Sequence, residues 1–447
     1  MAEGTKNADN HLGRAFEIFT RFCVDESNNQ RFRHLLVPLR VGKEAMSRAP
    51  DPIAVELCAG LGGIGIGLRA LGYHIAKAYD SWEEAVAVYN HNFPGEVATT
   101  CNLLSKKGQR LIETDCRQIG EIDLLAAGPP CKGFSQLRNG HHDGRNGHNR
   151  VLAAMPDYVA LLKPRLFLIE NVPDLIRHRG GRTLADLLRR LERPAKQLRY
   201  RVEYKVYDAA LFGTPQARRR ILILGVRQGS GMERLPETGP DLAPLFAVVR
   251  HGGTVSQDLA PYLNALKDPE DETLTSARQA FSDLPLLGPG EPEIERAYSS
   301  SAQSAFQRWV RVGAPEKLRD TRTPAVKVDT AHRLRHIPPG GCARVIPKEH
   351  LNGLSRRYDS AYRRLHPDAP STALCTKYDC VYHYEEQRSL SVREYARLQG
   401  IPDRITFPPD VVCRRSAYEM IGNSVPPLLI ERVLGETLEM RSRSLQR

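Results

Sequence analysis

The sequence lacks a hydrophobic run long enough to cross a membrane. No stretch of its 447 residues approaches the roughly 18 consecutive apolar residues that a transmembrane helix needs. The first ten residues, MAEGTKNADN, also lack the apolar core of a secretory signal. We therefore expect no membrane partner and a soluble protein that works in the cytoplasm.

The sequence also lacks the cysteine pattern of a disulfide-stabilised or zinc-knuckle domain. Its nine cysteines are an odd number and are scattered along the chain, so reduced thiols are expected. Cys375, Cys380 and His383 lie close together, but their C-x4-C-x2-H spacing offers no second ligand pair. We therefore predict no metal site.

Acidic residues are in deficit. The chain has 64 Lys and Arg against 52 Asp and Glu, a net charge of +12, which favours a polyanionic partner. Part of this excess of positive charge is concentrated in residues 321–364, which contain ten basic and three acidic residues. This segment suits a surface that contacts phosphates, and ordinary solvated charge is the alternative.

Short apolar runs alternate with helix-length segments from residue 53 to about residue 227. Near-continuous apolar strands separated by helices are typical of a parallel sheet covered on both faces. The active site of such an α/β sheet lies at the carboxyl ends of its strands. The runs are IAVELC (53–58), HIAKAYD (74–80), DLLAAGPP (123–130), RLFLIENV (165–172), RVEYKVYDA (201–209) and ILILGV (221–226).

The remaining segments differ in composition. Residues 1–50 are an extension of unknown role that ends at the breaker cluster APDP. Residues 228–361 are rich in proline and glycine, which predicts a second, loop-rich domain after the catalytic domain, 51–227. Helical patterns resume from about Arg388, and we expect residues 362–447 to return to the catalytic domain.

A glycine pattern follows the first predicted strand. Gly60, Gly62 and Gly65 form G-x-G-x-x-G, and Asp80 ends the next strand. Such glycines let the backbone approach a cofactor, while the acid accepts hydrogen bonds from both ribose hydroxyls. Any adenosine-bearing cofactor satisfies this pattern, so a nicotinamide enzyme and an S-adenosylmethionine enzyme remain equally favoured at this point.

Cys131 follows the third apolar run in GPPCKGFS. A thiol at the exposed tip of a strand, after two prolines and beside Lys132, is suited to act as a nucleophilic thiolate. For the other eight cysteines we predict buried, inert thiols.

Two further strand ends carry polar side chains. Burial at the rim of an apolar sheet is expected to raise the pKa of Glu170, so that it stays protonated and donates to a ring nitrogen. Asn171 beside it has the alternative role of a helix N-cap. Arg218 and Arg220 occupy alternate positions before the last strand, so they are expected to point to one face and to position a polar ring or a phosphate.

Together these segments resemble the DNA (cytosine-5) methyltransferase family, in the family's order. The resemblance covers about 53–227 and 360–435, with a variable insert between them. It implies a Rossmann-like methyltransferase sheet with a loop-rich target-recognition domain, and S-adenosylmethionine as cofactor. We expect no chromatin-reading or other large accessory domain beside the catalytic one, which favours the bacterial modification type. The motifs are ELCAGLGG, GPPCKGFS, ENV, QARRR, RRLHPDAPSTAL, SVREYARLQGIPD and GNSVPP.

The resemblance also implies roles for individual residues. Cys131 would add to cytosine C6, Glu170 would bind N3 and the exocyclic amine, and Arg218 and Arg220 would hold the base and the catalytic loop. The implied cofactor contacts, with Asp115 at the adenine, are Leu57, Cys58, Gly60, Leu61, Gly62, Gly63, Asp80, Ser81, Asp115, Cys116, Pro130, Asn423, Ser424 and Val425. The expected DNA contacts are Ser135, Gln136, Arg333, Arg335, Arg356 and Arg357.

The predicted activity is methyl transfer to C5 of a flipped-out cytosine in a specific duplex DNA sequence, through a covalent adduct of Cys131. A transfer-RNA cytosine-5 methyltransferase on the same fold is the close alternative, although its recognition insert is usually smaller. A nicotinamide oxidoreductase explains only the glycine turn and Asp80, and a non-catalytic DNA-binding protein has no need of Cys131 or Glu170. We expect the protein to be a monomer that acts on double-stranded DNA in the nucleoid. A restriction endonuclease that acts separately can accompany the enzyme.

Overall fold

The computed structural model describes residues 51–445, apart from 94, 96, 131–146, 230–233 and 352–361. The chain divides into two units, residues 1–49 and 50–447, and the description below concerns the second. The predicted N-terminal extension therefore lies outside the described residues. Among the described helices, none combines the length and the apolar character that a membrane span requires.

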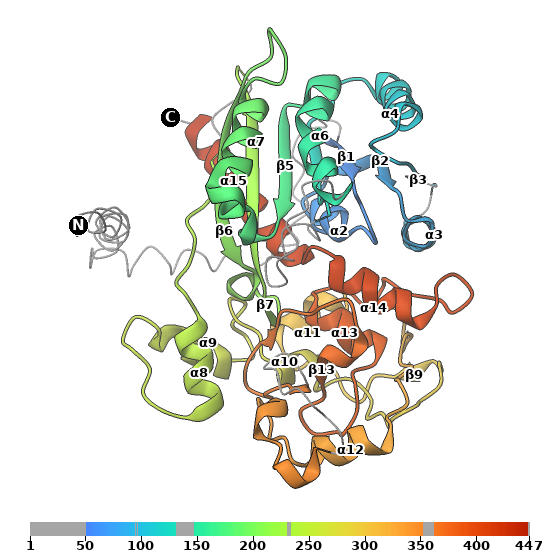
Figure 1. Ribbon diagram of the computed structural model, residues 1–447, viewed down its shortest axis with the longest axis vertical. Coiled ribbons are helices and arrows are strands. Elements are labelled where there is room, and N and C mark those ends of the chain that lie inside the picture. The colour runs from blue at the N-terminus through green and yellow to red at the C-terminus, as the bar shows by residue number, and fades with distance from the viewer. Residues whose placement is uncertain are drawn as a thin grey trace, which may run out of the picture. The chain divides into compact units, whose positions relative to one another are not determined.

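A seven-stranded sheet organises the first part of the unit, in the order β3-β2-β1-β4-β5-β8-β6 (Figure 1). All six apolar runs form strands of this sheet, so the predicted α/β class is confirmed. The three-residue strand β3 was not predicted, because so short a strand has no readable period. The strands are β1 (Ile53–Leu57), β2 (His74–Asp80), β3 (Ala98–Thr100), β4 (Leu124–Ala127), β5 (Leu166–Asn171), β6 (Tyr200–Asp208) and β8 (Arg219–Arg227).

The sheet is not wholly parallel, which corrects the sequence-based expectation. Strand β8 is antiparallel to both of its neighbours, β5 and β6. Only residues 209–218 connect β6 to β8, and they hold the 3₁₀ helix η6 (Ala209–Phe212) and the short strand β7 (Gln216–Ala217). A parallel connection needs a crossover of a dozen or more residues, usually with a helix, so this short link requires an antiparallel pair.

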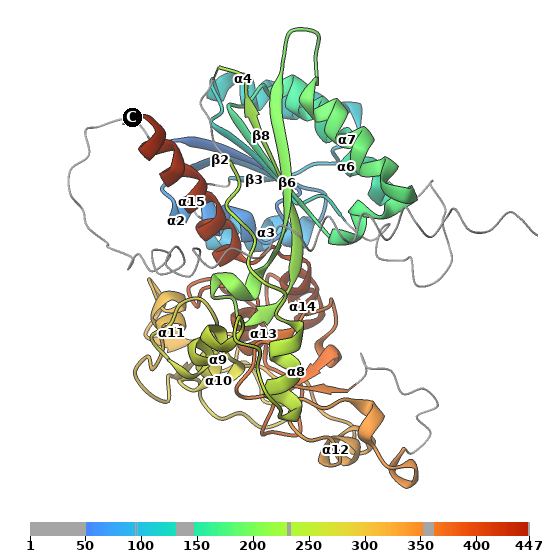
Figure 2. The ribbon, with the colours of Figure 1, turned by 90° about the vertical axis from the view of Figure 1, so that its left-hand side faces the viewer.

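Helices cover both faces of the sheet. Alternate strand residues, such as Leu125 and Ile169 on one face and Leu124 and Leu168 on the other, belong to two separate apolar clusters. Figure 2 shows α2 and α15 on one side of the sheet and α6 and α7 on the other. The helices around the sheet are α2 (Gly63–Ala70), α3 (Glu83–Asn92), α4 (Lys106–Ile119), α6 (Gly147–Leu162), α7 (Arg182–Glu192) and α15 (Pro427–Leu445), with the 3₁₀ helices η4 (Pro173–Ile176) and η5 (His178–Gly181).

A second core lies beyond the end of the sheet at which β5 ends (Figure 1). It joins α10 and α11 to α13 and α14, and α3 packs against it. The C-terminal residues 362–447 were predicted to return to the catalytic domain. Within them, α15 packs on the sheet, whereas α13 and α14 belong to this second core. The predicted domain boundaries themselves stay a prediction. The helices are α8 (Ala243–His251), α9 (Ala260–Lys267), α10 (Ala277–Phe281), α11 (Ala305–Val310), α12 (Val328–Arg335), α13 (Val392–Leu398) and α14 (Arg414–Asn423), with η7 (Ala343–Val345), η8 (Lys348–His350) and η9 (Tyr378–Cys380). The strands are the short pairs β9 (Arg296–Ala297) with β10 (Lys317–Leu318), β11 (Arg363–Arg364) with β13 (Val381–Tyr382), and β12 (Ser371–Thr372) with β7.

The motif SVREYARLQGIPD forms the polar centre of this second core. Ser391 and Glu394 close a capping box at the start of α13. Arg388 pairs with Glu394 through both guanidinium nitrogens, at 2.7 and 2.8 Å. Although burial opposes ionisation, Arg388 lowers the pKa of Glu394 to about 2. Arg397 is fully buried between Asp283 and Asp403.

Candidate active site

The turn between β1 and α2 has the backbone geometry that its glycines allow. Gly60 and Gly62 have φ angles of +55° and +92°, and Cys58 shares the left-handed region at +53°. Left-handed backbone favours glycine, and a non-glycine residue there marks a constrained site. Gly62 donates to the carbonyl of Ala59 at 2.8 Å and caps α2. The turn therefore presents its backbone at the carboxyl end of β1.

Asp80 lies beside this turn at the end of β2. One carboxylate oxygen accepts from the Gly60 amide at 2.8 Å, and the other accepts from the Trp82 amide at 2.9 Å. Burial raises the pKa of Asp80, while these backbone donors act against that rise. A carboxylate has about four acceptor positions, so both oxygens retain capacity for a ligand's hydroxyl groups. Ser81, the next residue, is exposed.

The C-terminal segment GNSV packs directly against the same turn. A Cβ atom added to Gly63 would come within 2.2 Å of Ser424 Oγ and 2.3 Å of the Val425 carbonyl oxygen. Only glycine at position 63 therefore permits this approach. Asn423, just before the contact, is exposed, whereas Leu61 and Val425 are buried. The structure thus brings together a turn and a segment that lie some 360 residues apart.

Glu170 and Arg220 form an ion pair at the end of β5. Arg220 Nε lies 2.7 Å from a Glu170 carboxylate oxygen, and the Glu170 residue is only 7% exposed. Burial raises the pKa of Glu170, while Arg220 and Arg218 oppose the rise. The pKa of Glu170 is therefore shifted upward, which is the direction that the sequence predicted. The pair arises because β8 runs antiparallel to β5 and so returns the start of β8 to this edge.

Asn171 links this strand end to the loop that leads into Cys131. Its side-chain amide donates to the carbonyl of Pro129 at 3.1 Å, and its oxygen accepts from the Val172 amide at 2.9 Å. Pro130 is half-buried next to Pro129. Cys131 itself lies outside the described residues.

Arg218 and Arg220 both act on the charge of Glu170, and Arg218 also reaches the C-terminal part of the chain. Arg218 lies between β7 and β8 and is 3% exposed. Its guanidinium donates to the carbonyls of Leu374 at 3.1 Å and Gly422 at 2.8 Å. It therefore holds the segment that precedes Asn423. Sequence reasoning missed this tie because both acceptors are backbone atoms distant in sequence.

Asp115 and Cys116 lie on helix α4. Ser105 caps this helix through its side chain, and the chain then runs from the end of β3 back to the start of β4. Asp115 accepts from the Tyr79 hydroxyl at 2.8 Å, and Cys116 is buried in the core. Helix α4 thus draws both residues away from the loop edge, so we do not include them among the cofactor contacts.

The end of β3 holds candidates that the sequence did not indicate. Cys101 donates its amide to the Asp80 carbonyl at 2.6 Å, and Asn102 follows it. The carboxyl ends of neighbouring parallel strands meet at one edge. Cys101 and Asn102 therefore lie next to the end of β2, at the edge of the sheet that carries Asp80.

The basic segment is only partly exposed. Arg333 is buried, and it donates to the Leu351 carbonyl at 3.0 Å and to the Tyr362 hydroxyl at 2.8 Å. A guanidinium held inside in this way is not on the surface that a phosphate would contact. Arg335 is exposed and donates to Gln387 at 3.3 Å. The other predicted DNA contacts, Ser135, Gln136, Arg356 and Arg357, lie outside the described residues.

Comparison with known proteins identifies the family. The profile described as C-5 cytosine-specific DNA methylase matches residues 54–439. The chain belongs to this family. The predictions of DNA cytosine-5 methyl transfer and of S-adenosylmethionine as methyl donor are thereby confirmed.

Individual relatives agree with this assignment. The chain is 28% identical to the Type II methyltransferase M.AgeI of Thalassovita gelatinovora, over 86% of this chain and 99% of the relative. It is 27% identical to M1.HphI of Haemophilus parahaemolyticus, over 87% of each chain. Among solved structures, a DNA modification methyltransferase encoded within an E. coli prophage superposes with a TM-score of 0.64 at 19% identity. It covers 88% of this chain and 99% of its own, which shows the shared methylase fold.

Proposed function

We propose that this DNA methylase acts through a covalent adduct between Cys131 and C6 of a flipped-out cytosine. The hydrogen bond from Asn171 to the Pro129 carbonyl carries the proposal, because it ties the loop that leads into Cys131 to the strand end that holds Glu170. Pro130 is the last described residue before Cys131, and the strand end tied to this loop carries the buried Glu170 carboxyl with its partner Arg220. Cytosine C5 is a weak nucleophile until a nucleophile adds at C6 and N3 is protonated.

In the proposed sequence of steps, the Cys131 thiolate forms a bond to C6 and Glu170 supplies a proton to N3. Its raised pKa favours the protonated form that this step needs. C5 then carries the electron density of an enamine and accepts the methyl group. Loss of the C5 proton to water and return of the N3 proton to Glu170 restore the aromatic ring and expel the Cys131 thiolate. Arg220 holds Glu170 in place throughout, and Arg218 holds the segment before Asn423.

The residues around the β1–α2 turn fit the cofactor. Beside Gly60 a Cβ atom would meet nothing within 4 Å, so there is open space next to the Asp80 carboxylate. We assign the ribose hydroxyls to Asp80, and the adenine side to Cys101 and Asn102. The bound cofactor supplies an activated methyl group. The remaining proposed contacts are Leu57, Cys58, Leu61, Gly62, Gly63, Ser81, Pro130, Asn423, Ser424 and Val425.

The finer assignments follow from the chain's own composition and from the names of its relatives. We propose that 51–227 is the catalytic domain, that 228–361 recognises the target sequence, with Arg335 at a phosphate, and that 362–447 completes the methylase. Flipping a base costs a few kcal/mol, which contacts from such a domain must offset. We also propose a monomer that modifies nucleoid DNA as Type II enzymes do, with any restriction endonuclease acting separately.

A trapping experiment tests the adduct. Duplex DNA with 5-fluorocytosine at the target position should accept the methyl group and then stall, since fluorine cannot leave as a cation. We expect a denaturation-resistant complex that requires S-adenosylmethionine and is absent in Cys131→Ser. Cys413→Ser is the matched control, because Cys413 is an exposed thiol that caps α14 and serine is an equally good cap. Trapping on transfer RNA alone would favour the RNA enzyme, and trapping by Cys131→Ser would refute the proposed nucleophile.

A further inference from the structure

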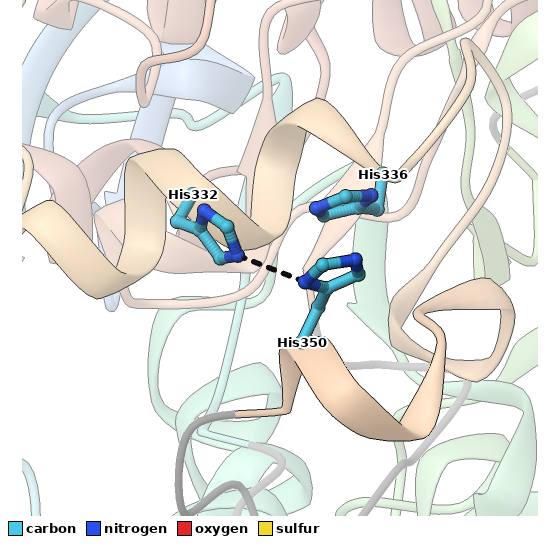
Figure 3. Close-up of side chains that lie close together, drawn as sticks. All are labelled: His332, His336 and His350. Atoms are coloured by element: carbon cyan, nitrogen blue, oxygen red, sulfur yellow. Dashed lines mark hydrogen bonds between the residues drawn. The ribbon is translucent and has the colours of Figure 1, made fainter.

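Three histidines come together in the basic segment, away from the active site. His332 lies on α12, His336 caps the end of the same helix, and His350 ends the 3₁₀ helix η8. Figure 3 shows the three rings turned toward one another, with His350 facing the two helix residues. One nitrogen from each ring lies within 4.8 Å of the other two. All three residues are half-buried.

The spacing of these rings matches that of metal ligands. His332 and His336 are four residues apart on one helix, which places them on the same face. His332 Nε2 and His350 Nδ1 are 3.2 Å apart. Two nitrogens bound tetrahedrally to one zinc ion at about 2.0–2.1 Å are separated by roughly 3.3 Å. The His336 ring is stacked on His350, with centroids 3.8 Å apart and an angle of 10° between the ring planes, so the His336 ring must turn out of this stack for its nitrogen to share the ion.

The local chemistry also favours a cation held by neutral imidazoles. A metal ion binds the neutral form of imidazole, through the lone pair of one ring nitrogen. Imidazole ligands suit zinc and its neighbours in the first transition row. The three residues are half-buried, so the cluster is reached by solvent, which can supply the ion and a water as fourth ligand.

The site would strengthen a part of the fold that has little apolar core. The cluster beside it contains five buried residues: Leu334, Ile337, Ala343, Ile346 and Tyr382. Small cores are commonly supplemented by a structural metal. Arg333 already ties α12 to the Leu351 carbonyl, next to η8. We propose that His332, His336 and His350 bind one zinc ion that joins α12 to η8.

The proposal is independent of the catalytic assignment and is tested by metal content. The untagged full chain is treated with a chelator, exposed to zinc, passed through gel filtration and analysed for metal. We expect about one zinc per chain. His336→Ala and His350→Gln should each lower zinc affinity by more than the roughly 10–100-fold that loss of an outer-shell partner costs. His251→Ala, an exposed histidine of α8, is the control and should bind zinc as the wild type does.

A spectroscopic measurement separates this site from adventitious binding. Cobalt in place of zinc should give the visible absorption of a four-coordinate site with three nitrogen ligands, in the wild type and in His251→Ala only. Zinc should also raise the melting temperature of these two proteins and not that of the cluster variants, whose folding is checked by circular dichroism. No zinc uptake by the wild type, or equal uptake by His336→Ala and His350→Gln, would overturn the proposal.

Discussion

Glu56, which precedes the last residue of β1, tests how burial controls charge next to the cofactor turn. Its carboxylate is fully buried and accepts from the Gly65 amide at 3.1 Å and from the Tyr89 hydroxyl at 3.2 Å. Burial raises the pKa of Glu56 from 4.5 to about 7, and the lowering effects of Arg69 and of these two donors are not enough to prevent it. The side chain is therefore partly protonated near neutral pH.

This shift makes stability depend on pH in a predictable direction. Because the folded protein binds the Glu56 proton more tightly than the unfolded chain, the free energy of unfolding falls as pH rises from about 4.5 through about 7. The full interval corresponds to about 3 kcal/mol. Glu56→Gln cannot ionise, and its amide offers an acceptor to Gly65 and a donor to the Tyr89 hydroxyl. The variant therefore imitates the protonated state at every pH.

Urea unfolding at pH 5 and pH 8 measures the effect. We expect the stability of Glu56→Gln relative to the wild type to rise by about 2–3 kcal/mol between these two pH values. Glu121→Gln is the control: Arg165 and Arg227 lower the pKa of this exposed carboxyl, so its difference from the wild type should stay flat over the same range. A flat difference for Glu56→Gln as well would refute the reasoning that burial dominates at this position.

Three further predictions concern cofactor binding by Asp80, the buried ion pairs of Arg397 and the DNA contact of Arg335. Asp80→Asn should weaken S-adenosylmethionine binding by about 1.5–3 kcal/mol in calorimetry, because it removes a charge-assisted contact, and tight binding of NAD by the wild type would contradict the assignment. Arg397→Ala leaves Asp283 and Asp403 buried without their main cation, so urea unfolding should show a loss of roughly 3–5 kcal/mol, against less than about 1 kcal/mol for the exposed Arg308→Ala. Arg335→Ala should reduce the slope of log DNA affinity against log salt by about 0.9, and Arg117→Ala on α4 should leave it unchanged.

Much of this protein could be predicted from local sequence. Six strands were recognised because each is a short apolar run of its own, and the glycine turn with Asp80 was recognised because its residues are close in sequence. The family motifs keep their order, so the methylase assignment needed no knowledge of packing. The raised pKa of Glu170 followed from its place at the end of a buried strand.

Other features were decided by contacts between distant segments. The direction of β8 depends on the length of the link from β6, and that direction brings Arg220 to Glu170. Arg333 was predicted to contact DNA because it is a basic residue in a basic segment, yet packing buries it against the Leu351 carbonyl. The approach of Ser424 to Gly63 likewise spans most of the chain. Residue type and local spacing determine which chemistry a side chain can perform, but its partners and its exposure depend on which segments the packed core brings together.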